Sequence, residues 1–211
     1  MTKQERAPKA DWSEAMRDAR RERIIDAAAR VFSELGFDRA SVRKIATEAG
    51  CTTGAIYPLF ASKEEIYAEL LSRSLRDLQD RWRASDSEAA TPEERVRARA
   101  FAALDFYLER PTDFTLSFYL SAGLGRKGMG KDLDAELNER LAELDAMQQE
   151  VLAECIGPEA AARESSAVFA FVTGLLVMQL RGRFHVFDGD PHTLLARYLD
   201  TLLGPPSSTQ E

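Results

Sequence analysis

The chain has 211 residues, of which 45% are hydrophobic and 30% charged, and its formal net charge is −7. A chain of this length can bury a core without disulfides or a structural metal, in one large domain or two small ones. The first 75 residues carry 13 basic and 12 acidic side chains, so the acidity lies in the remaining two thirds. A nearly neutral N-terminal module can bind DNA if its cations share one face, and the net charge therefore does not exclude nucleic acid.

Two further features bear on the compartment of the protein. The first 21 residues are charged and contain no apolar segment of the kind found in secretory signals. The longest apolar stretch, residues 168–180, is shorter than the roughly 18–20 residues of a membrane span. Cys51 and Cys155 match no metal or redox spacing. We expect a cytoplasmic protein with reduced thiols, no membrane partner, no metal and no cofactor.

Helical periodicity recurs along the whole chain, and no strand-like alternation interrupts it. We therefore predict an all-α fold of about nine helices. The expected helices cover residues 19–35, 41–49, 52–57, 62–84, 91–110, 112–122, 131–155, 157–184 and 188–203. Residues 1–16 are expected to form a flexible arm, residues 123–130 a glycine-rich loop, and residues 205–211 a disordered tail.

The second and third expected helices, "SVRKIATEAGCTTGAIYPLF", have the spacing of a helix-turn-helix. Gly50 lies in the turn, where glycine adopts a left-handed backbone without steric cost. Thr52, Thr53, Gly54 and Ala55 give the next helix a small, uncharged leading end, which suits insertion into a DNA major groove. Threonine can contact phosphates, base edges and the thymine methyl group. Pro58 ends or kinks this helix.

This stretch and its flanks strongly resemble the DNA-binding domain of TetR-family transcriptional regulators. The resemblance covers about residues 20–71, and the later helices match the family in number, order and length. The matching residues are Ala27, Ala28, Phe32, Gly36, Phe37, Ile45, Ala46, Gly50, Gly54, Tyr57, Phe60, Ser62 and Lys63. The resemblance implies a helix-turn-helix domain over residues 17–64 and a ligand-binding and dimerisation domain over residues 65–204.

The resemblance also implies individual roles on DNA. Thr52, Thr53, Gly54 and Ala55 would lie in the groove, and Arg43, Tyr57 and Lys63 would contact phosphate or the groove edge. Ser41 would either cap its helix or touch phosphate. Each role has a structural alternative: Tyr57 as a core aromatic, Lys63 as a solvated lysine, and Arg43 paired with Glu48 or Asp38. The family often has polar or aromatic residues where this chain has Pro58 and Leu59, and Arg17, Arg20 and Arg21 could compensate or form a solvated helix start.

The last two helices predict self-association. Residues 168–180 are apolar nearly all round, and the last helix carries a leucine stripe, so both need cover on more than one side. Pairing with their copies in a four-helix bundle would supply it, and would place two recognition helices about 34–36 Å apart on a palindromic operator. The expected interface residues are Phe171, Leu175, Leu195, Tyr198, Leu199 and Leu202.

Aromatic and flexible side chains in the fifth to eighth helices predict a pocket for an unknown, mostly apolar small-molecule inducer with one or two polar anchors. Plain core packing is the alternative for each residue. The expected lining is Phe101, Leu104, Tyr107, Phe114, Phe118, Tyr119, Met147, Phe169, Val172, Thr173, Met178 and Gln179. We expect the ligand to release the protein from DNA by moving the fourth helix, which joins both halves.

Two other protein classes remain open. An all-α enzyme would need a nucleophile with a base, a carboxylate pair or a metal site. His185 and His192 stand in no ligand spacing, and the acids of the seventh helix lie beside Arg140 and Lys131 as on a solvated face. A helical adaptor would keep the fold but lose the residues that contact DNA, whereas Arg43, Tyr57 and Lys63 are all present.

Overall fold

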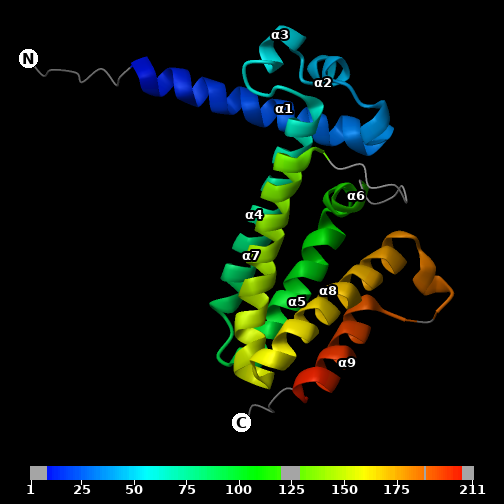
Figure 1. The fold of residues 1–211 in the computed structure, drawn as a ribbon. Coiled ribbons are helices and arrows are strands. Elements are labelled where there is room, and N and C mark those ends of the chain that lie inside the picture. Colours follow the sequence, from blue (N-terminus) through cyan, green and yellow to red (C-terminus); the bar gives the residue numbers. More distant parts are fainter. Residues whose placement is uncertain (1–8, 120–128, 188, 206–211) are drawn as a thin grey trace, which may run out of the picture. The chain divides into compact units, whose positions relative to one another are not determined.

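The computed structural model describes residues 9–119, 129–187 and 189–205, and within them it contains helices and no strand (Figure 1). The all-α prediction is confirmed. The α-helices are α1 (Lys9–Arg39), α2 (Val42–Glu48), α3 (Thr53–Ile56), α4 (Lys63–Asp86), α5 (Pro92–Glu109), α6 (Pro111–Tyr119), α7 (Lys131–Ile156), α8 (Pro158–Leu180) and α9 (Pro191–Leu203). A short 3-10 helix, η1 (Arg183–His185), joins α8 to α9.

Two helices differ in extent from the sequence prediction. Helix α1 begins at Lys9, so residues 9–16 are helical where a flexible arm was expected, because good helix formers such as Ala10, Ala15 and Met16 dominate this stretch. Helix α8 ends at Leu180, four residues early, because Gly182 adopts a left-handed backbone with φ of 62°. The expected loop over residues 123–130 and the tail over residues 205–211 fall mostly outside the described residues.

The chain forms two compact units, and α4 runs from one into the other. Unit 1 comprises Met1–Leu71 and Thr115–Asp134, and unit 2 comprises Ser72–Phe114 and Ala135–Glu211. The sequence-based boundary at residues 64 and 65 falls inside the part of α4 that belongs to unit 1. The start of α4 is fixed there because the Tyr67 hydroxyl donates a hydrogen bond to the Leu116 carbonyl.

Unit 1 is built on the apolar face of α1, against which α2 and α3 pack. Ile24, Ile25 and Phe32 of that face are almost completely buried. The rings of Phe32 and Tyr67 meet edge to face with their centroids 4.9 Å apart, which ties α1 to α4. This packing holds the short helices α2 and α3 on one side of α1.

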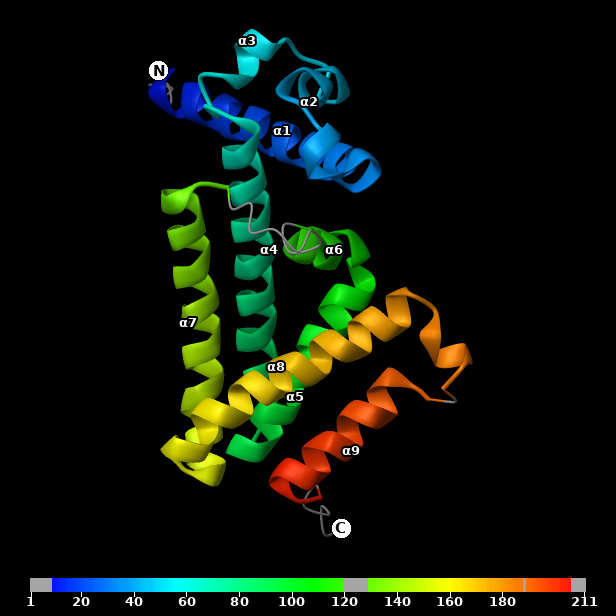
Figure 2. The same cartoon turned by 45° about the vertical axis from the view of Figure 1, so that its right-hand side comes forward.

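Unit 2 packs α5 against α8 and α9, which lie side by side (Figure 2). Helix α5 starts at a complete capping box between Thr91 and Glu94, as its sequence predicts. Leu104 of α5, Leu176 of α8 and Leu199 of α9 are each at most 1% exposed. The core of unit 2 therefore lies between these three helices.

Candidate nucleic-acid interface

One groove of about 580 Å³ in unit 1 brings together five of the eight residues predicted to contact DNA. It is formed by α2, α3 and the start of α4. Its lining is Ala40, Ser41, Val42, Arg43, Thr53, Tyr57, Ala61, Ser62, Lys63 and Glu64. We call this surface the recognition groove. Thr52, Gly54 and Ala55 belong to the same short helix or its cap and complete the predicted set.

The recognition helix α3 has one buried anchor and an exposed remainder. Ile56 is fully buried, whereas Thr52 and Gly54 are exposed. Tyr57 caps α3 and is 58% exposed, so it is not a core aromatic. An aromatic side chain left this open beside a helix-turn-helix is free to reach an external partner with its hydroxyl.

Gly54 occupies a position where nothing inside the protein requires glycine. A Cβ at Gly54 would meet only the Thr52 Oγ1, at 3.8 Å, and its φ is not positive. Gly50 differs, because its φ of 64° is one that other residues rarely adopt. A glycine without an internal cause in a helix costs stability relative to alanine, so the cause is expected outside the chain.

Ser41 and Arg43 define the α2 side of the groove. The Ser41 hydroxyl caps α2 by accepting a hydrogen bond from the Lys44 backbone N–H at 3.3 Å. The Arg43 side chain is exposed and has no ion pair among the described residues. Its expected alternative partner, Glu48, binds Arg30 instead at 2.6 Å. The Arg43 guanidinium is therefore available to an anion.

Lys63 is neither solvated nor turned outward. Its Nζ donates hydrogen bonds to the Phe37 carbonyl at 2.9 Å and the Ala40 carbonyl at 3.3 Å. The same nitrogen lies 4.4 Å from the centroid of the Phe37 ring. Lys63 thus neutralises carbonyl oxygens near the end of α1 and joins them to the start of α4, while still lining the groove.

Arginines of α1 brace the helix-turn-helix from behind. Arg23 donates to the Ala49 carbonyl at the end of α2 at 2.9 Å. Arg21 pairs with Glu69 of α4 at 2.6 Å and lies over the Phe60 ring. Arg21 is therefore engaged inside unit 1 and not free for the DNA contact considered from the sequence, whereas Arg17 and Arg20 are exposed.

The residues predicted to bind an inducer lie in unit 2 but do not share one face. Leu104, Phe114 and Val172 are buried, and Tyr107 contacts the rings of Phe106 and Phe114. Phe169 is 60% exposed on α8 and Gln179 is also exposed, so both face outward. Phe101, Met147, Thr173 and Met178 are half-buried. The side chains of Phe118 and Tyr119 lie outside the described residues.

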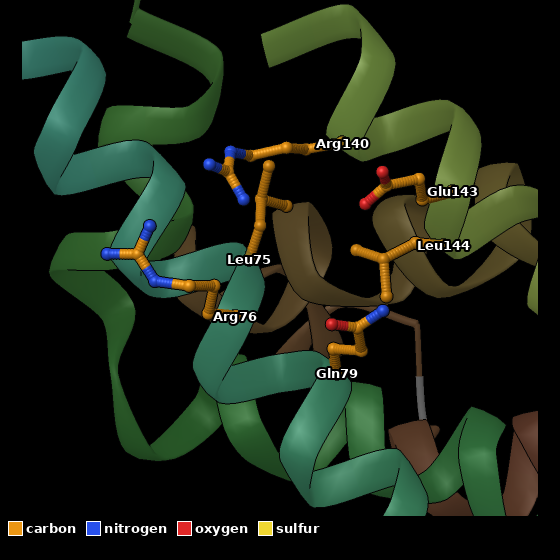
Figure 3. Close-up of a pocket in the computed structure, with 6 residues that line it drawn as sticks. All are labelled: Leu75, Arg76, Gln79, Arg140, Glu143 and Leu144. Atoms are coloured by element: carbon orange, nitrogen blue, oxygen red, sulfur yellow. The ribbon is translucent and has the colours of Figure 1, made fainter. Parts of the chain in front are cut away.

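A cavity of unit 2 lies between α4 and α7 instead (Figure 3). Its lining is Leu75, Arg76, Gln79, Arg140, Glu143 and Leu144. Sequence reasoning assigned Arg140 to a solvated face, yet its Nε atom is buried. Only the i, i+4 spacing of Arg140 with Leu144 could have indicated that this arginine lies beside the apolar stripe of α7.

The residues predicted to form a dimer interface are divided by the structure. Leu175, Leu195 and Leu199 are buried within the protomer, so they hold α8 and α9 in unit 2 and cannot form an outer face. The Phe171 ring stacks on Tyr198, with centroids 4.4 Å apart, and Leu202 is half-buried.

The apolar side chains that α8 does expose are Phe169, Val177 and Leu180. Between Phe169 and Val177 lies Gly174, where an added Cβ would have no neighbour within 4 Å. By length and hydropathy α8 could cross a membrane, a property that core helices of soluble proteins share.

In the described residues, no three His, Cys, Asp or Glu side chains gather as they would around a metal. His192 instead pairs with Asp105 across α9 and α5, at 2.7 Å.

Comparison with known proteins agrees with this geometry. The family model "Bacterial regulatory proteins, tetR family" matches residues 24–70. The transcriptional repressor KstR2 of Mycobacterium tuberculosis is 38% identical over 88 residues, which cover 42% of this chain and 44% of KstR2. YdgC, an HTH-type transcriptional regulator of Bacillus subtilis, is 33% identical over 150 residues, which cover 64% of this chain and 74% of YdgC. The match to KstR2 thus spans less than half of that protein.

A solved structure extends the likeness to nearly the whole fold. FadR of Bacillus subtilis, crystallised with stearoyl-CoA, superposes with a TM-score of 0.70 at 21% identity, covering 87% of this chain and 98% of FadR. At this identity the likeness concerns the fold alone. The groove of unit 1 and the helices of unit 2 therefore have counterparts in one architecture.

Proposed function

The chain belongs to the TetR family of bacterial regulatory proteins, and we propose that it is a repressor that binds a palindromic operator as a homodimer and is released by a mostly apolar small molecule. As a member of this family it is a DNA-binding regulator of transcription and not an enzyme. The proposal concerns the finer points: which residues hold DNA, how two copies associate, and what class of ligand acts.

The recognition groove supports DNA binding at residue level. Arg43 supplies an unpaired cation, Tyr57 an exposed hydroxyl and Thr53 a hydroxyl and a methyl group on one surface. We assign Arg43 and Tyr57 to phosphates, and Thr52, Thr53 and Ala55 to base edges. Ser41 keeps its capping bond and Lys63 its carbonyl bonds, so both border the phosphate without being its first ligands.

Gly54 is the single observation that carries the proposal. Its exposure and the open space above it mean that only a close external surface accounts for a glycine there. A DNA backbone or base edge that approaches α3 at van der Waals distance is such a surface. Glycine at this point lets the backbone of α3 approach the duplex more closely than any side chain would allow.

The exposed face of α8 supports a homodimer. From Ser165 to Leu180 the helix carries no charge, yet Phe169, Val177 and Leu180 are exposed on it. Gly174 lies between them without a neighbour, so a second helix can approach its backbone closely.

Charge also complements an antiparallel crossing of α8 with its copy. Glu159 and Glu164 lie near the start of α8, and Arg181 and Arg183 follow its end, so opposite charges would meet at both ends. We therefore assign the α8 face to a second copy of this chain.

Relatives support the class of ligand. FadR of Bacillus subtilis was crystallised with stearoyl-CoA, and fatty-acyl compounds therefore form the first class to test here. A long acyl chain satisfies the expectation of a mostly apolar ligand. We expect it to bind in unit 2 and to lower operator affinity by favouring a conformation in which the paired recognition helices no longer match the duplex.

Selection of bound sequences from a random duplex pool tests the proposal. We expect an inverted repeat, with affinity that falls steeply as salt rises. Gly54→Ala should leave the thermal midpoint unchanged or raised but weaken operator binding by about tenfold. Ser33→Ala, an equally small change on the exposed face of α1, is the matched control and should bind as the wild type does. Enrichment of no sequence, or equal binding by Gly54→Ala, would refute the proposal.

A further inference from the structure

Unit 2 contains buried polar atoms that have no partner. Among the described residues there are four: Trp82 Nε1, Arg140 Nε, Gln148 Oε1 and the Tyr198 hydroxyl. Folded proteins pair the large majority of such atoms, so each exception calls for a cause. Three of the four lie on α4 and α7, which identifies the boundary between these helices as a place where polar partners are missing.

The three atoms follow one line along that boundary. Leu75, Gln79 and Trp82 occupy one face of α4, and Arg140, Leu144 and Gln148 occupy one face of α7. We call these six residues the α4–α7 seam. Within it Arg140 extends from α7 toward Leu75, and Gln79 lies beside Leu144 (Figure 3). The Gln79 amide nitrogen lies 3.2 Å from the Met147 sulfur, which joins the outer and inner parts of the seam.

The outer part of the seam presents an incompletely neutralised guanidinium. Arg140 Nε has no partner, and Arg140 Nη2 lies 3.4 Å from a Glu136 carboxylate oxygen, at the long end of hydrogen bonding. Glu143 lines the same cavity but forms no ion pair with Arg140. The Nε and Nη2 edge of a guanidinium matches the two oxygens of a carboxylate. This part of the seam is therefore suited to an organic acid.

The inner part of the seam presents one donor and one acceptor without charge. The Trp82 Nε1–H can only donate and the Gln148 Oε1 can only accept, and Gln148 is just 4% exposed. Arg99 lies over Trp82 but is already bound to both carboxylate oxygens of Asp86 and to the Met147 carbonyl. A neutral amide has both complementary atoms, a carbonyl oxygen for Trp82 and an N–H for Gln148.

We propose that the α4–α7 seam binds an amphiphilic organic acid that carries an amide near its carboxylate, with Arg140 holding the carboxylate and Trp82 and Gln148 the amide. This inference rests on the proposed function, because the ligand is the one that regulates operator binding. The present cavity of about 10 Å³ admits about one water molecule, so the ligand must part α4 from α7. Since α4 continues to Lys63 at the recognition groove, parting the helices would act on the element that both units share.

Fluorescence of Trp82 provides a local test in the full-length chain. The only other tryptophan is Trp12, so Trp12→Phe leaves Trp82 as the sole reporter. The probes are N-palmitoylglycine, with carboxylate and amide, palmitate, with carboxylate only, and methyl palmitate, with neither. We expect Trp82 emission to change on binding, with N-palmitoylglycine binding about tenfold more tightly than palmitate and palmitate about tenfold more tightly than the ester.

Variants assign each preference to its residue. Arg140→Met should abolish the preference for the acid over the ester, and Gln148→Leu the preference for the amide. Arg163→Met, on the exposed side of α8, is the matched control and should keep both. Equal binding of the three probes, binding of none of them, a silent Trp82, or preferences that survive both substitutions would each overturn the seam.

Operator binding without probe, measured on the same samples, separates this inference from the proposed function. Arg140→Met and Gln148→Leu proteins that bind operator normally but no longer discriminate between probes support the seam. A wild-type protein that binds no operator refutes the proposed function and, with it, the regulatory role of the seam.

Discussion

Units 1 and 2 differ in how they treat buried polar groups. In unit 1 every buried side-chain nitrogen and oxygen of the described residues has a partner, and the cations of Arg21, Arg23 and Lys63 are bound to carboxylate or carbonyl oxygens. In unit 2 four buried polar atoms have none, and α8 exposes large apolar side chains. Unit 1 is internally complete, whereas unit 2 contains groups that fit a partner from outside.

The difference suits the two tasks of a ligand-responsive regulator. A surface that recognises DNA gains from side chains already held in place, because less conformational entropy is lost on binding. A surface that senses a ligand must change when the ligand arrives, and unpaired groups make the empty state less stable than the bound one. The comparison predicts that substitutions in unit 2 alter association and response, and that those in unit 1 alter stability and DNA affinity.

The largest expected effect comes from charging the exposed face of α8. Val177→Asp should convert a dimer to a monomer and lower operator affinity by about 100-fold or more, because two linked half-sites bind far more tightly than one. Val177 is 47% exposed, so the substitution spares the core. Leu141→Asp on α7 is the matched control, at 44% exposure. Sedimentation velocity and fluorescence anisotropy provide the two measurements, and a Val177→Asp dimer would remove this assignment.

The next largest effect tests whether unit 1 is held together by Lys63. Lys63→Gln should lower the free energy of unfolding by about 2 kcal/mol, since a charged donor to two carbonyls is lost. Lys44→Gln, which loses one exposed carbonyl contact to Arg39, should cost less. Urea denaturation measures both. If the two variants were equally stable, Lys63 would have to be regarded as a groove residue alone.

Arg43→Gln should weaken operator binding by about tenfold and lower the slope of log affinity against log salt by about 0.9, as expected when one phosphate contact is lost. Lys63→Gln should leave that slope unchanged, because its charge is already bound within unit 1. Arg163→Gln removes the same charge far from the groove and serves as the control. Titrations by anisotropy at four salt concentrations measure the slopes. An unchanged slope for Arg43→Gln would contradict its assignment to phosphate.

Local patterns predicted most of the fold. Caps and breakers such as Thr91 with Glu94 and Pro111 act within a few residues, so they set helix limits that sequence reasoning can recover. The helix-turn-helix was recoverable for the same reason, because its turn and its buried positions lie within twenty residues. The exposed state of Tyr57 followed from this local geometry.

Contacts between distant residues were not predictable. Nothing near Lys63 in sequence indicates that its ammonium group binds the Phe37 and Ala40 carbonyls, 26 and 23 residues away. Likewise a leucine stripe does not reveal which side faces the protomer, and Leu195 and Leu199 proved to be internal. The polar seam was missed because Arg140 and Gln148 resemble solvated residues until α4 is placed beside them.

The smallest expected effect concerns a buried carboxyl group of unit 2. Burial raises the pKa of Asp113, and this outweighs its hydrogen bond from Ser74 and the attraction of Arg110 and Arg73. The folded protein therefore holds this proton more tightly than the unfolded chain, and Asp113 destabilises the fold as pH rises through its folded pKa. Asp113→Asn should raise the thermal midpoint by about 1–2 °C at pH 7 and by nothing below the ordinary value of 3.8.

Glu109 supplies the opposite case, which makes the measurement decisive. Its hydrogen bonds from Arg81 lower the pKa of Glu109, so its stabilising contribution is present above the ordinary value of 4.5 and is lost as pH falls through the folded pKa. Glu109→Gln should therefore lower the thermal midpoint at pH 7 and not at pH 2. Calorimetry of both variants across this range separates a carboxyl group that opposes folding from one that supports it. Curves of the same sign would mean that Asp113 is paired as well as any group of unit 1.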